Sequence, residues 1–470
     1  MPSSSNEDKG IETANVKKIS LKKYVIKVFM DSTVSVVSSI LCTADIRRKI
    51  FRTLVLLFCL TGFLYQCVTF LQYAFQYPTD LEIAIDKPTS IEVPAYTFCN
   101  DNPIMRTKFC AKYPDHCTLA DKTICKRYPH YCRAVETEEI WIPKKEYYLW
   151  DHNMTLEEFV ELGQNLTDFF NGIGGYQDIQ EENVEGPFLR TKGMISGSRL
   201  GCYSINSLVD SPQEAKQYKQ NSLFPTPVST FKFNVQPDEI LVPGDRPGIL
   251  FSVHSQYEAV NPFERGIFMK AGRSYKIYVN MEREILLPLP YKTNCTNYTE
   301  DWLENNRIGP RSKKMCVQKC FFEFSLKELN CTMSFILYPT ETRICSDEEM
   351  MSADFDPEEL DKLYKCIEKC KDNCLKTKRY LEVQERYERE FGTPNETMEE
   401  SGLISVEIYL DMYEVVRFQH RPQYRDVELF SVIGGFIGVW LGVSLVQVVD
   451  LLESLCRIFT YICRKKYAKE

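Results

Sequence analysis

The chain has 470 residues, of which 44% are hydrophobic and 26% are charged. These are ordinary values for a globular protein, so they exclude a collagen-like, low-complexity or wholly disordered chain. The formal net charge is −8, yet residues 1–53 carry ten Lys/Arg against five Asp/Glu, and residues 454–470 carry five against one. An acidic middle between basic ends disfavours nucleic-acid binding and indicates a membrane.

Two uncharged segments are candidates for membrane spans. Residues 54–73 and 429–449 contain no charged residue, and each is long enough to cross the roughly 30 Å hydrocarbon core as a helix. The alternative is a buried apolar helix in a soluble enzyme. Basic residues flank both segments on the side of the chain termini, which predicts that both termini are cytosolic. We therefore predict a cytosolic segment over 1–53, transmembrane helices over 54–76 and 429–453, an extracellular domain over 77–428, and a short cytosolic tail over 454–470.

Glycosylation sequons and cysteines support this topology. All six Asn-x-Ser/Thr sequons lie between the two segments, at Asn153, Asn165, Asn294, Asn297, Asn330 and Asn395. Of nineteen cysteines, only Cys42, Cys59, Cys67, Cys456 and Cys463 lie in or beside the predicted membrane and cytosolic segments. The even number that remains, in an oxidising compartment, predicts a disulfide-rich domain. A zinc site is the alternative, which an extracellular location disfavours.

The extracellular segment has mixed periodicity. Residues 276–280 and 405–409 alternate with period two and predict strands, whereas residues 356–371 have helical spacing. That spacing places Leu360, Leu363, Tyr364 and Ile367 on one face. We predict an α+β membrane protein. No nucleophile motif, histidine cluster or phosphate-binding loop is present, so we predict no enzyme, cofactor or metal site.

Four motifs then occur in order: Val93-Pro-Ala-Tyr-Thr-Phe-Cys-Asn100, Gly201-Cys-Tyr-Ser-Ile-Asn206, Leu287-Pro-Leu-Pro-Tyr291, and the glycine-rich run from Ile433 to Ser444. With them the chain resembles the degenerin/epithelial sodium channel family, which includes the acid-sensing ion channels. The resemblance implies a hand-and-ball ectodomain, with a finger over about 100–200 and a thumb over about 292–378. It also implies a homotrimer or a heterotrimer with related subunits. Such a protein conducts Na⁺ across the plasma membrane and is blocked by amiloride-type compounds.

The resemblance further implies the pore residues. Gly442, Val443 and Ser444 correspond to the selectivity filter, and Ser431 to the gate region. The other pore-lining candidates are Gly434, Gly435, Gly438, Asp450 and Glu453. The glycines at 434, 438 and 442 are four residues apart and fall on one face of a helix, where simple helix packing is the alternative. Acids near the inner edge of a span face an ion path or extend to the membrane surface.

The disulfide pairing is likewise implied by the resemblance. It pairs Cys99 with Cys202, Cys295 with Cys374, Cys316 with Cys370, Cys320 with Cys366, and Cys331 with Cys345. Two further disulfides are expected among Cys110, Cys117, Cys125 and Cys132, and their connectivity stays open. The spacings Cys316-x3-Cys320 and Cys366-x3-Cys370-x3-Cys374 place thiols one helical turn apart.

Two features leave the activity open. The family's histidine-glycine pair should fall near Val37 and Ser38, and no histidine occurs there. This favours an alternative, a non-conducting or obligate heteromeric receptor or accessory subunit of such a channel. Acidic residues gather at Glu136, Glu138 and Glu139, and again at Asp347, Glu348, Glu349, Asp354, Asp356, Glu358 and Glu359. Such clusters share protons, which raises their pKa values, or they are solvated surface. The gating stimulus is therefore a proton, a peptide or a mechanical force, unless the channel is constitutively open.

Overall fold

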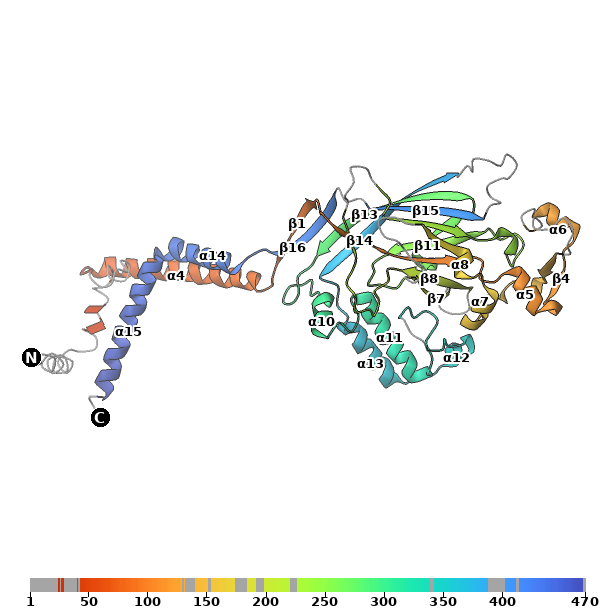
Figure 1. Ribbon diagram of the computed structural model, residues 1–470. Helices are drawn as coiled ribbons and strands as arrows, with labels where there is room; N and C mark the ends of the chain where they lie inside the picture. The colour runs from red at the N-terminus through yellow and green to blue at the C-terminus, as the bar shows by residue number, and fades with distance from the viewer. Residues whose placement is uncertain are drawn as a thin grey trace, which may run out of the picture. The chain divides into compact units, whose positions relative to one another are not determined.

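The computed structural model describes residues 24–25, 27–28, 40, 43–128, 131, 140–150, 154–173, 184–191, 198–219, 226–338, 342–387, 402–410 and 414–467. The chain divides into two compact units. We name the two units after the predicted topology: the membrane unit comprises the residues up to Asp80 and those from Pro422 onward, and the extracellular unit comprises Leu81–Arg421. Elements carry the labels of Figure 1.

The membrane unit consists of three long helices in its described part, α4 (Ile46–Ala74), α14 (Asp426–Leu441) and α15 (Leu445–Tyr467). Helix α4 begins where the Asp45 carboxylate accepts a hydrogen bond of 3.1 Å from the Arg47 amide. It is long and apolar enough to cross a membrane. The other two helices reach that length only as a pair, bent by 77°. The single helix predicted over 429–453 is therefore wrong in its geometry, because the chain leaves the helix after Leu441 and starts a new one at Leu445.

The extracellular unit is built on two main sheets. The seven-stranded sheet contains β1 (Thr79–Asp86), β16 (Val415–Pro422), β13 (Arg273–Ile285), β15 (Leu403–Leu410), β10 (Ser229–Asn234), β6 (Phe170–Ile173) and β14 (Leu375–Tyr387), which pairs with β13. The five-stranded sheet has the order β12 (Ile267–Lys270), β11 (Gly248–His254), β3 (Ala95–Asn100), β8 (Arg199–Ile205) and β7 (Val184–Thr191). Two short ribbons pair β2 (Ile91–Glu92) with β9 (Gln217–Tyr218), and β4 (Cys117–Leu119) with β5 (Trp141–Pro143).

Strands β13 and β14 are the longest strands of the seven-stranded sheet, with 13 residues each. The burial of β13 follows its sequence. Its buried residues alternate with half-buried ones, as period-two patterning requires. It pairs antiparallel with β14 and parallel with β15, and Tyr278 lies opposite Tyr409. The strands predicted over 276–280 and 405–409 are thus parts of β13 and β15.

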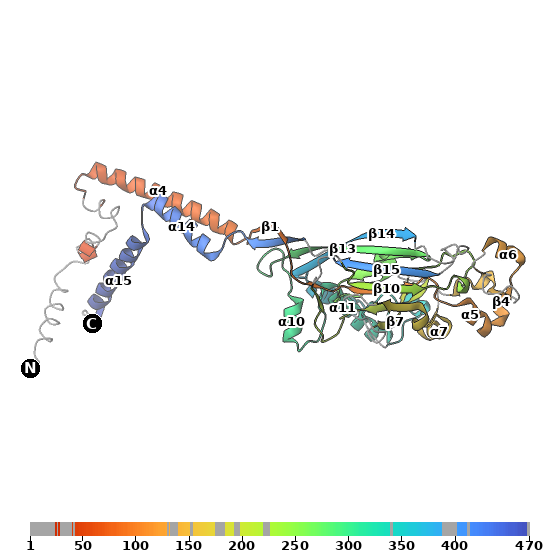
Figure 2. The same cartoon turned by 45° about the horizontal axis from the view of Figure 1, so that its top comes forward.

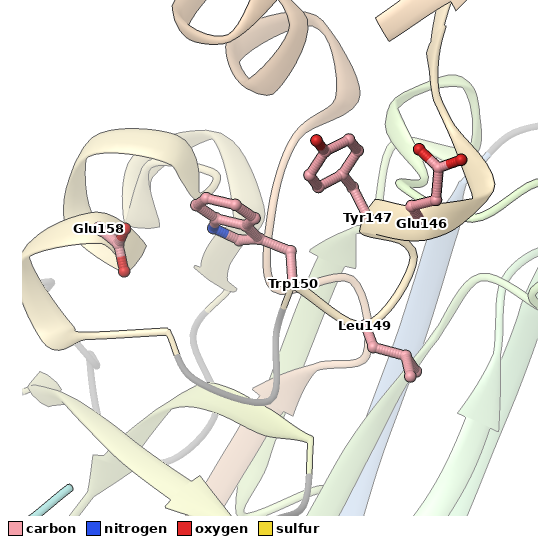
Figure 3. Close-up of a pocket in the computed structure, with 5 residues that line it drawn as sticks. All are labelled: Glu146, Tyr147, Leu149, Trp150 and Glu158. Carbon is pink, nitrogen blue, oxygen red and sulfur yellow. The ribbon is translucent and has the colours of Figure 1, made fainter. Parts of the chain in front are cut away.

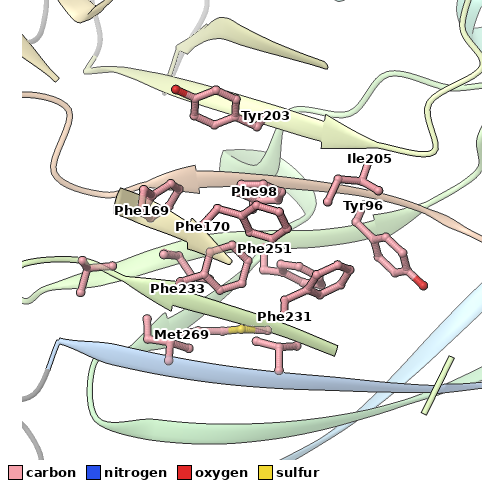
Figure 4. Packing of buried hydrophobic residues seen from close by; sticks show 14 of the residues in the cluster. Tyr96, Phe98, Phe169, Phe170, Tyr203, Ile205, Phe231, Phe233, Phe251 and Met269 are labelled. Carbon is pink, nitrogen blue, oxygen red and sulfur yellow. The ribbon is translucent and has the colours of Figure 1, made fainter. Parts of the chain in front are cut away.

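The core lies between the two sheets. Figure 4 shows aromatic rings from β3, β8 and β11 meeting rings from β6 and β10. Phe98 is fully buried, and the centroid of its ring lies 5.0 Å from those of Phe170 and Phe233. Aromatic pairs at this spacing add to the stabilisation that burial of their apolar surface provides. In both views the seven-stranded sheet lies above the five-stranded one (Figures 1 and 2).

Short helices cover the ends and one side of this sandwich. They are α5 (Arg106–Lys112), α6 (Lys122–Arg127), α7 (Leu156–Leu162), α8 (Leu166–Phe169), α9 (Pro262–Arg265), α10 (Tyr298–Glu304) and α12 (Asp347–Ser352). Two longer helices, α11 (Lys313–Leu329) and α13 (Pro357–Lys369), pack together and are called the thumb helices below. Helices α5, α6 and α7 form the finger region.

Helix α13 corresponds to the helix predicted over 356–371. The Asp356 carboxylate caps it by accepting a hydrogen bond of 3.1 Å from the Glu358 amide. Leu363 is buried, and Leu360 and Ile367 pack against the same cluster. Tyr364, predicted on the buried face, is 64% exposed. The apolar contact with α11 is narrower than the predicted face, and the phenol at its edge is left to solvent.

Candidate pore segment

Helix α14 is held against α4 by side chains of the membrane unit. The Trp440 indole donates a hydrogen bond of 2.6 Å to the Gln66 side-chain oxygen. Its ring lies over Gly62, where an added Cβ would come within 2.7 Å of ring atoms. Further along, the Phe70 ring makes an edge contact with the Phe436 ring, 5.8 Å away. Close approach at a glycine, with one polar contact beside it, is a usual way for membrane helices to pack.

The glycines of α14 lie away from this contact. An added Cβ at Gly434, Gly435 or Gly438 would meet no described atom within 4 Å. Ser431 is exposed as well. Together these residues form a strip along α14 that has small side chains or none and that no described side chain covers. Intramolecular helix packing, the alternative interpretation of the glycine spacing, therefore finds no support among the described contacts at these glycines.

The helix ends at Gly442, which was predicted to continue its face. Gly442 is the C-terminal cap, with a φ of +64°, and its amide still donates to the Gly438 carbonyl at 3.1 Å. This left-handed conformation favours glycine, because a side chain there is strained. The prediction that Gly442 shares a helical face with Gly434 and Gly438 is consequently wrong.

Ser444 starts the next helix. Its amide donates to the Gln447 side-chain oxygen at 2.9 Å, and its hydroxyl accepts from the Gln447 amide at 3.4 Å. This reciprocal pair is a capping box, which stabilises the beginning of a helix. Gly442, Val443 and Ser444 thus form a non-helical segment between α14 and α15, at the bend.

The two acids predicted beyond this segment lie on α15. Asp450 is half-buried. Glu453 forms an ion pair with Arg457 one turn further on, and both side chains are exposed. The ion pair reduces the net charge that Glu453 contributes to α15.

Five of the described disulfides join the pairs that the resemblance implied. They are Cys99–Cys202, Cys295–Cys374, Cys316–Cys370, Cys320–Cys366 and Cys331–Cys345. In the finger region Cys110 pairs with Cys117. Cys125 is also disulfide-bonded, whereas Cys132 lies outside the described residues. Cys316 and Cys320 both lie in α11, as the spacing predicts. Cys366 lies in α13 and Cys370 is its C-terminal cap, whereas Cys374 lies beyond the helix, so the prediction is wrong for Cys374.

Three of the seven acids at 347–359 form ion pairs with basic side chains. Asp347 forms a nearly buried ion pair of 3.3 Å with Arg199. Both guanidinium nitrogens of Arg343 donate to Glu349, at 2.8 and 2.9 Å, and Arg343 lowers the pKa of that carboxyl to about 2. Hydrogen bonds from Lys327 and Lys362 lower the pKa of Glu359 as well.

Shared protons would raise these pKa values. For Glu349 and Glu359 the described contacts therefore oppose a proton-sensing role. Glu136, Glu138 and Glu139, the other predicted cluster, lie outside the described residues.

A small cavity of about 340 Å³ lies in the finger region, lined by Glu146, Tyr147, Leu149, Trp150 and Glu158. In Figure 3 the Trp150 ring lies between Glu158 and Tyr147, and Leu149 points the other way. Tyr147 in turn stacks on His116, with ring centroids 4.0 Å apart. Aromatic faces beside carboxylates suit a cationic group.

The predicted glycosylation sites differ in accessibility. Asn165, Asn297 and Asn330 are exposed, at the ends of α8, α10 and α11. Asn294 is half-buried and has a φ of +39°. Asn153 and Asn395 lie outside the described residues, as do Val37 and Ser38 of the expected histidine-glycine position. Among the residues that are described, no group of three or more His, Cys, Asp or Glu could hold a metal ion.

Sequence reasoning missed the break in the second span and the Trp440–Gln66 contact. The break has a local signal, a glycine followed by Ser444-Leu-Val-Gln447, which is the Ser-x-x-Gln pattern of a capping box. The apolar composition of the segment concealed it. Gln66 is one of two glutamines in the uncharged run 54–73, and an amide in such a run usually has a partner on another helix.

Comparisons with known proteins identify similar chains. The family described as amiloride-sensitive sodium channel matches residues 29–454. The chain is 22% identical over 430 residues to the acid-sensing ion channel 1C of Danio rerio, covering 84% of this chain and 76% of that protein. It is 24% identical over 227 residues to the epithelial sodium channel subunit alpha of Pelodiscus sinensis, covering 44% and 35%.

A shorter match joins 71 residues, at 30% identity, to the FMRFamide-activated amiloride-sensitive sodium channel of Cornu aspersum, covering 15% of this chain and 11% of that protein. Among solved structures, a proton-activated chloride channel aligns with a TM-score of 0.26 and 6% identity over 86% of this chain and 97% of that chain. That likeness is too low to bear on the fold.

Proposed function

Because the chain belongs to the amiloride-sensitive sodium channel family, we propose that it is a pore-forming subunit that conducts Na⁺ across the plasma membrane. The pore is formed by an oligomer, a trimer of this chain or of this chain with related subunits. Gly442, Val443 and Ser444 form the selectivity filter, and amiloride-type compounds block it. Both termini are cytosolic, and the extracellular unit receives the stimulus.

The break between α14 and α15 is the observation that carries this proposal. A continuous helix uses its carbonyl groups internally, whereas a non-helical segment leaves carbonyls free to replace water around a cation. Small residues at this segment let neighbouring copies approach closely. The open strip at Gly434, Gly435 and Gly438 supports the same orientation, with α4 packed on another side of α14.

The first test is voltage-clamp recording from cells that express the chain alone, and the chain with Ser431→Phe. A bulky residue on the exposed side of α14 should hold neighbouring helices apart and increase the current. We expect a Na⁺ current that is larger in the variant and that amiloride reduces. The current should be much smaller when potassium replaces sodium in the bath. Silence from both, with surface labelling showing normal export, would contradict a homomeric pore. The next step would then be co-expression with related subunits.

The filter has a sharper test at one position. Gly442→Ala places a Cβ on a residue with a φ of +64°, whereas asparagine tolerates that conformation better. We expect Gly442→Ala to lose Na⁺ over K⁺ selectivity or current, and Gly442→Asn to retain more of both. Equal behaviour of the two variants would show that backbone geometry at this residue does not set selectivity.

A further inference from the structure

A second, larger cavity lies within the extracellular unit. Its volume is about 730 Å³, within the range of small-molecule sites. It is bordered by α10, by the start of α11, by the ends of β13 and β14 that lie next to the thumb helices, and by the β2–β9 ribbon. Tyr257, Tyr298 and Trp302 supply aromatic walls.

Arg311 is the most buried charge on this wall. Its side chain is 8% exposed, and its guanidinium lies 3.9 Å from the ring centroid of Tyr257 and 4.0 Å from that of Trp302. One nitrogen donates to the Gln213 carbonyl at 2.9 Å. Its Nε has no hydrogen-bond partner among the described residues, and no described carboxylate lies within 4.0 Å of it. A buried cation without a counter-ion is costly.

Three more charged residues line the cavity, Arg379, Glu92 and Glu258, and each is half-buried. Arg379 on β14 has an unpartnered Nε, and burial lowers the pKa of its guanidinium. Glu92 and Glu258 act on Arg379 through space, yet neither forms an ion pair within 4.0 Å in the described part of the chain. The other charged residues of the wall do have partners, since Glu214 pairs with Arg307 at 3.1 Å and Lys376 with Asp372 at 2.9 Å.

We propose that this cavity binds a small zwitterion of the amino-acid class. Its carboxylate pairs with Arg311 and Arg379, its ammonium pairs with Glu92 and Glu258, and its apolar side chain lies against Tyr298 and Trp302.

The charge of the ligand is inferred from the positive and negative side chains that line the cavity. A simple anion would satisfy the two arginines and leave the two half-buried carboxylates without an ion-pair partner, and a simple cation would do the reverse. A ligand with one charge of each sign gives a partner to both sets. Charge-assisted hydrogen bonds of this kind are the strong ones.

The proposal does not depend on ion conduction, so it is tested by binding. Isothermal titration of the purified full chain in detergent would use L-phenylalanine, N-acetyl-L-phenylalanine, which lacks the ammonium, and phenethylamine, which lacks the carboxylate. We expect L-phenylalanine to bind at least tenfold more tightly than either analogue. No heat of binding from L-phenylalanine at 10 mM, or equal affinity for all three, would overturn the proposal.

Variants identify the site. Arg379→Gln should weaken L-phenylalanine binding at least tenfold and leave phenethylamine binding unchanged, and Glu92→Gln should weaken L-phenylalanine and leave the N-acetyl analogue unchanged. Arg311→Lys keeps the charge but not the planar stacking, so it separates loss of binding from loss of folding. Arg343→Gln, the same change at an exposed ion pair that does not line the cavity, is the matched control. Unaltered affinity in both cavity variants would refute the assignment.

Discussion

His254 illustrates how a single buried residue determines a response to pH. Its Nδ1 donates to the Ser255 carbonyl at 2.9 Å, so its Nε2 accepts from the Thr97 hydroxyl at 2.7 Å. Thr97 in turn accepts from Ser204, 2.9 Å away. This chain of hydrogen bonds fits the neutral imidazole. Burial, more than any nearby charge, lowers the pKa of His254 to about 4.

The unfolded chain binds that proton near pH 6.5, well above the folded value. Stability is therefore complete above pH 6.5 and falls as the pH is lowered toward 4, by about 3 kcal/mol in all. We predict that His254→Gln flattens the decline of the unfolding midpoint between pH 7 and 4.5. Thr97→Val should destabilise the protein yet keep the decline. Identical slopes for His254→Gln and the unsubstituted protein would contradict the assignment.

At the scale of elements, the contact between α4 and α14 depends on the space above Gly62. Gly62→Val would drive a side chain into the Trp440 ring, which typically costs about 1–3 kcal/mol. We predict a lower thermal midpoint for Gly62→Val in detergent, and partial recovery in the double variant with Trp440→Leu. Gly434→Ala adds a methyl group that meets no described atom within 4 Å and should not lower the midpoint. A Gly62→Val protein as stable as the original would rule out this close contact.

The thumb helices pair through residues that lie one turn apart. Cys316 and Cys320 on α11 are joined to Cys370 and Cys366 at the end of α13, in antiparallel order. The tie resists separation of the two helices more than the modest apolar contact alone would. The base of these helices also borders the 730 Å³ cavity. A ligand there would touch Ser312, just before α11, Asn373, which follows α13, and the first residues of β14.

At the scale of the whole molecule, the sequons test the topology. We predict that Asn165, Asn297 and Asn330 carry glycans when the chain is expressed in animal cells, because they are exposed and lie between the two apolar segments. Each Asn→Gln substitution should remove one glycan, seen as a mobility shift before but not after endoglycosidase treatment. Asn294, half-buried with a positive φ, should show no shift. Absence of every glycan would contradict an extracellular location.

The sequence pattern predicts those elements in which the local periodicity of apolar residues matches the side that is buried in the fold. Strands β13 and β15 alternate because one side faces the core, and α13 has both a capping residue and an apolar face. The disulfide pairs are predicted from the family that the motifs resemble, because cysteine spacing alone cannot select one connectivity among many. The bend at Gly442 and the charges that face the larger cavity depend on backbone conformation and on distant residues brought together. The periodicity of apolar residues along the sequence therefore predicts neither the bend nor the charged cavity wall.

The break in the second span also separates two helix macrodipoles. The last carbonyl groups of α14 carry a partial negative charge, and the first amides of α15 a partial positive one. Ser444 and Gln447 already satisfy part of the positive end, so the uncompensated end is the negative one. Where several copies of α14 end at one level, their partial charges add. In the proposed oligomer, the field at that level would attract cations and repel anions without a single ionised side chain, at any pH at which the helices stay folded.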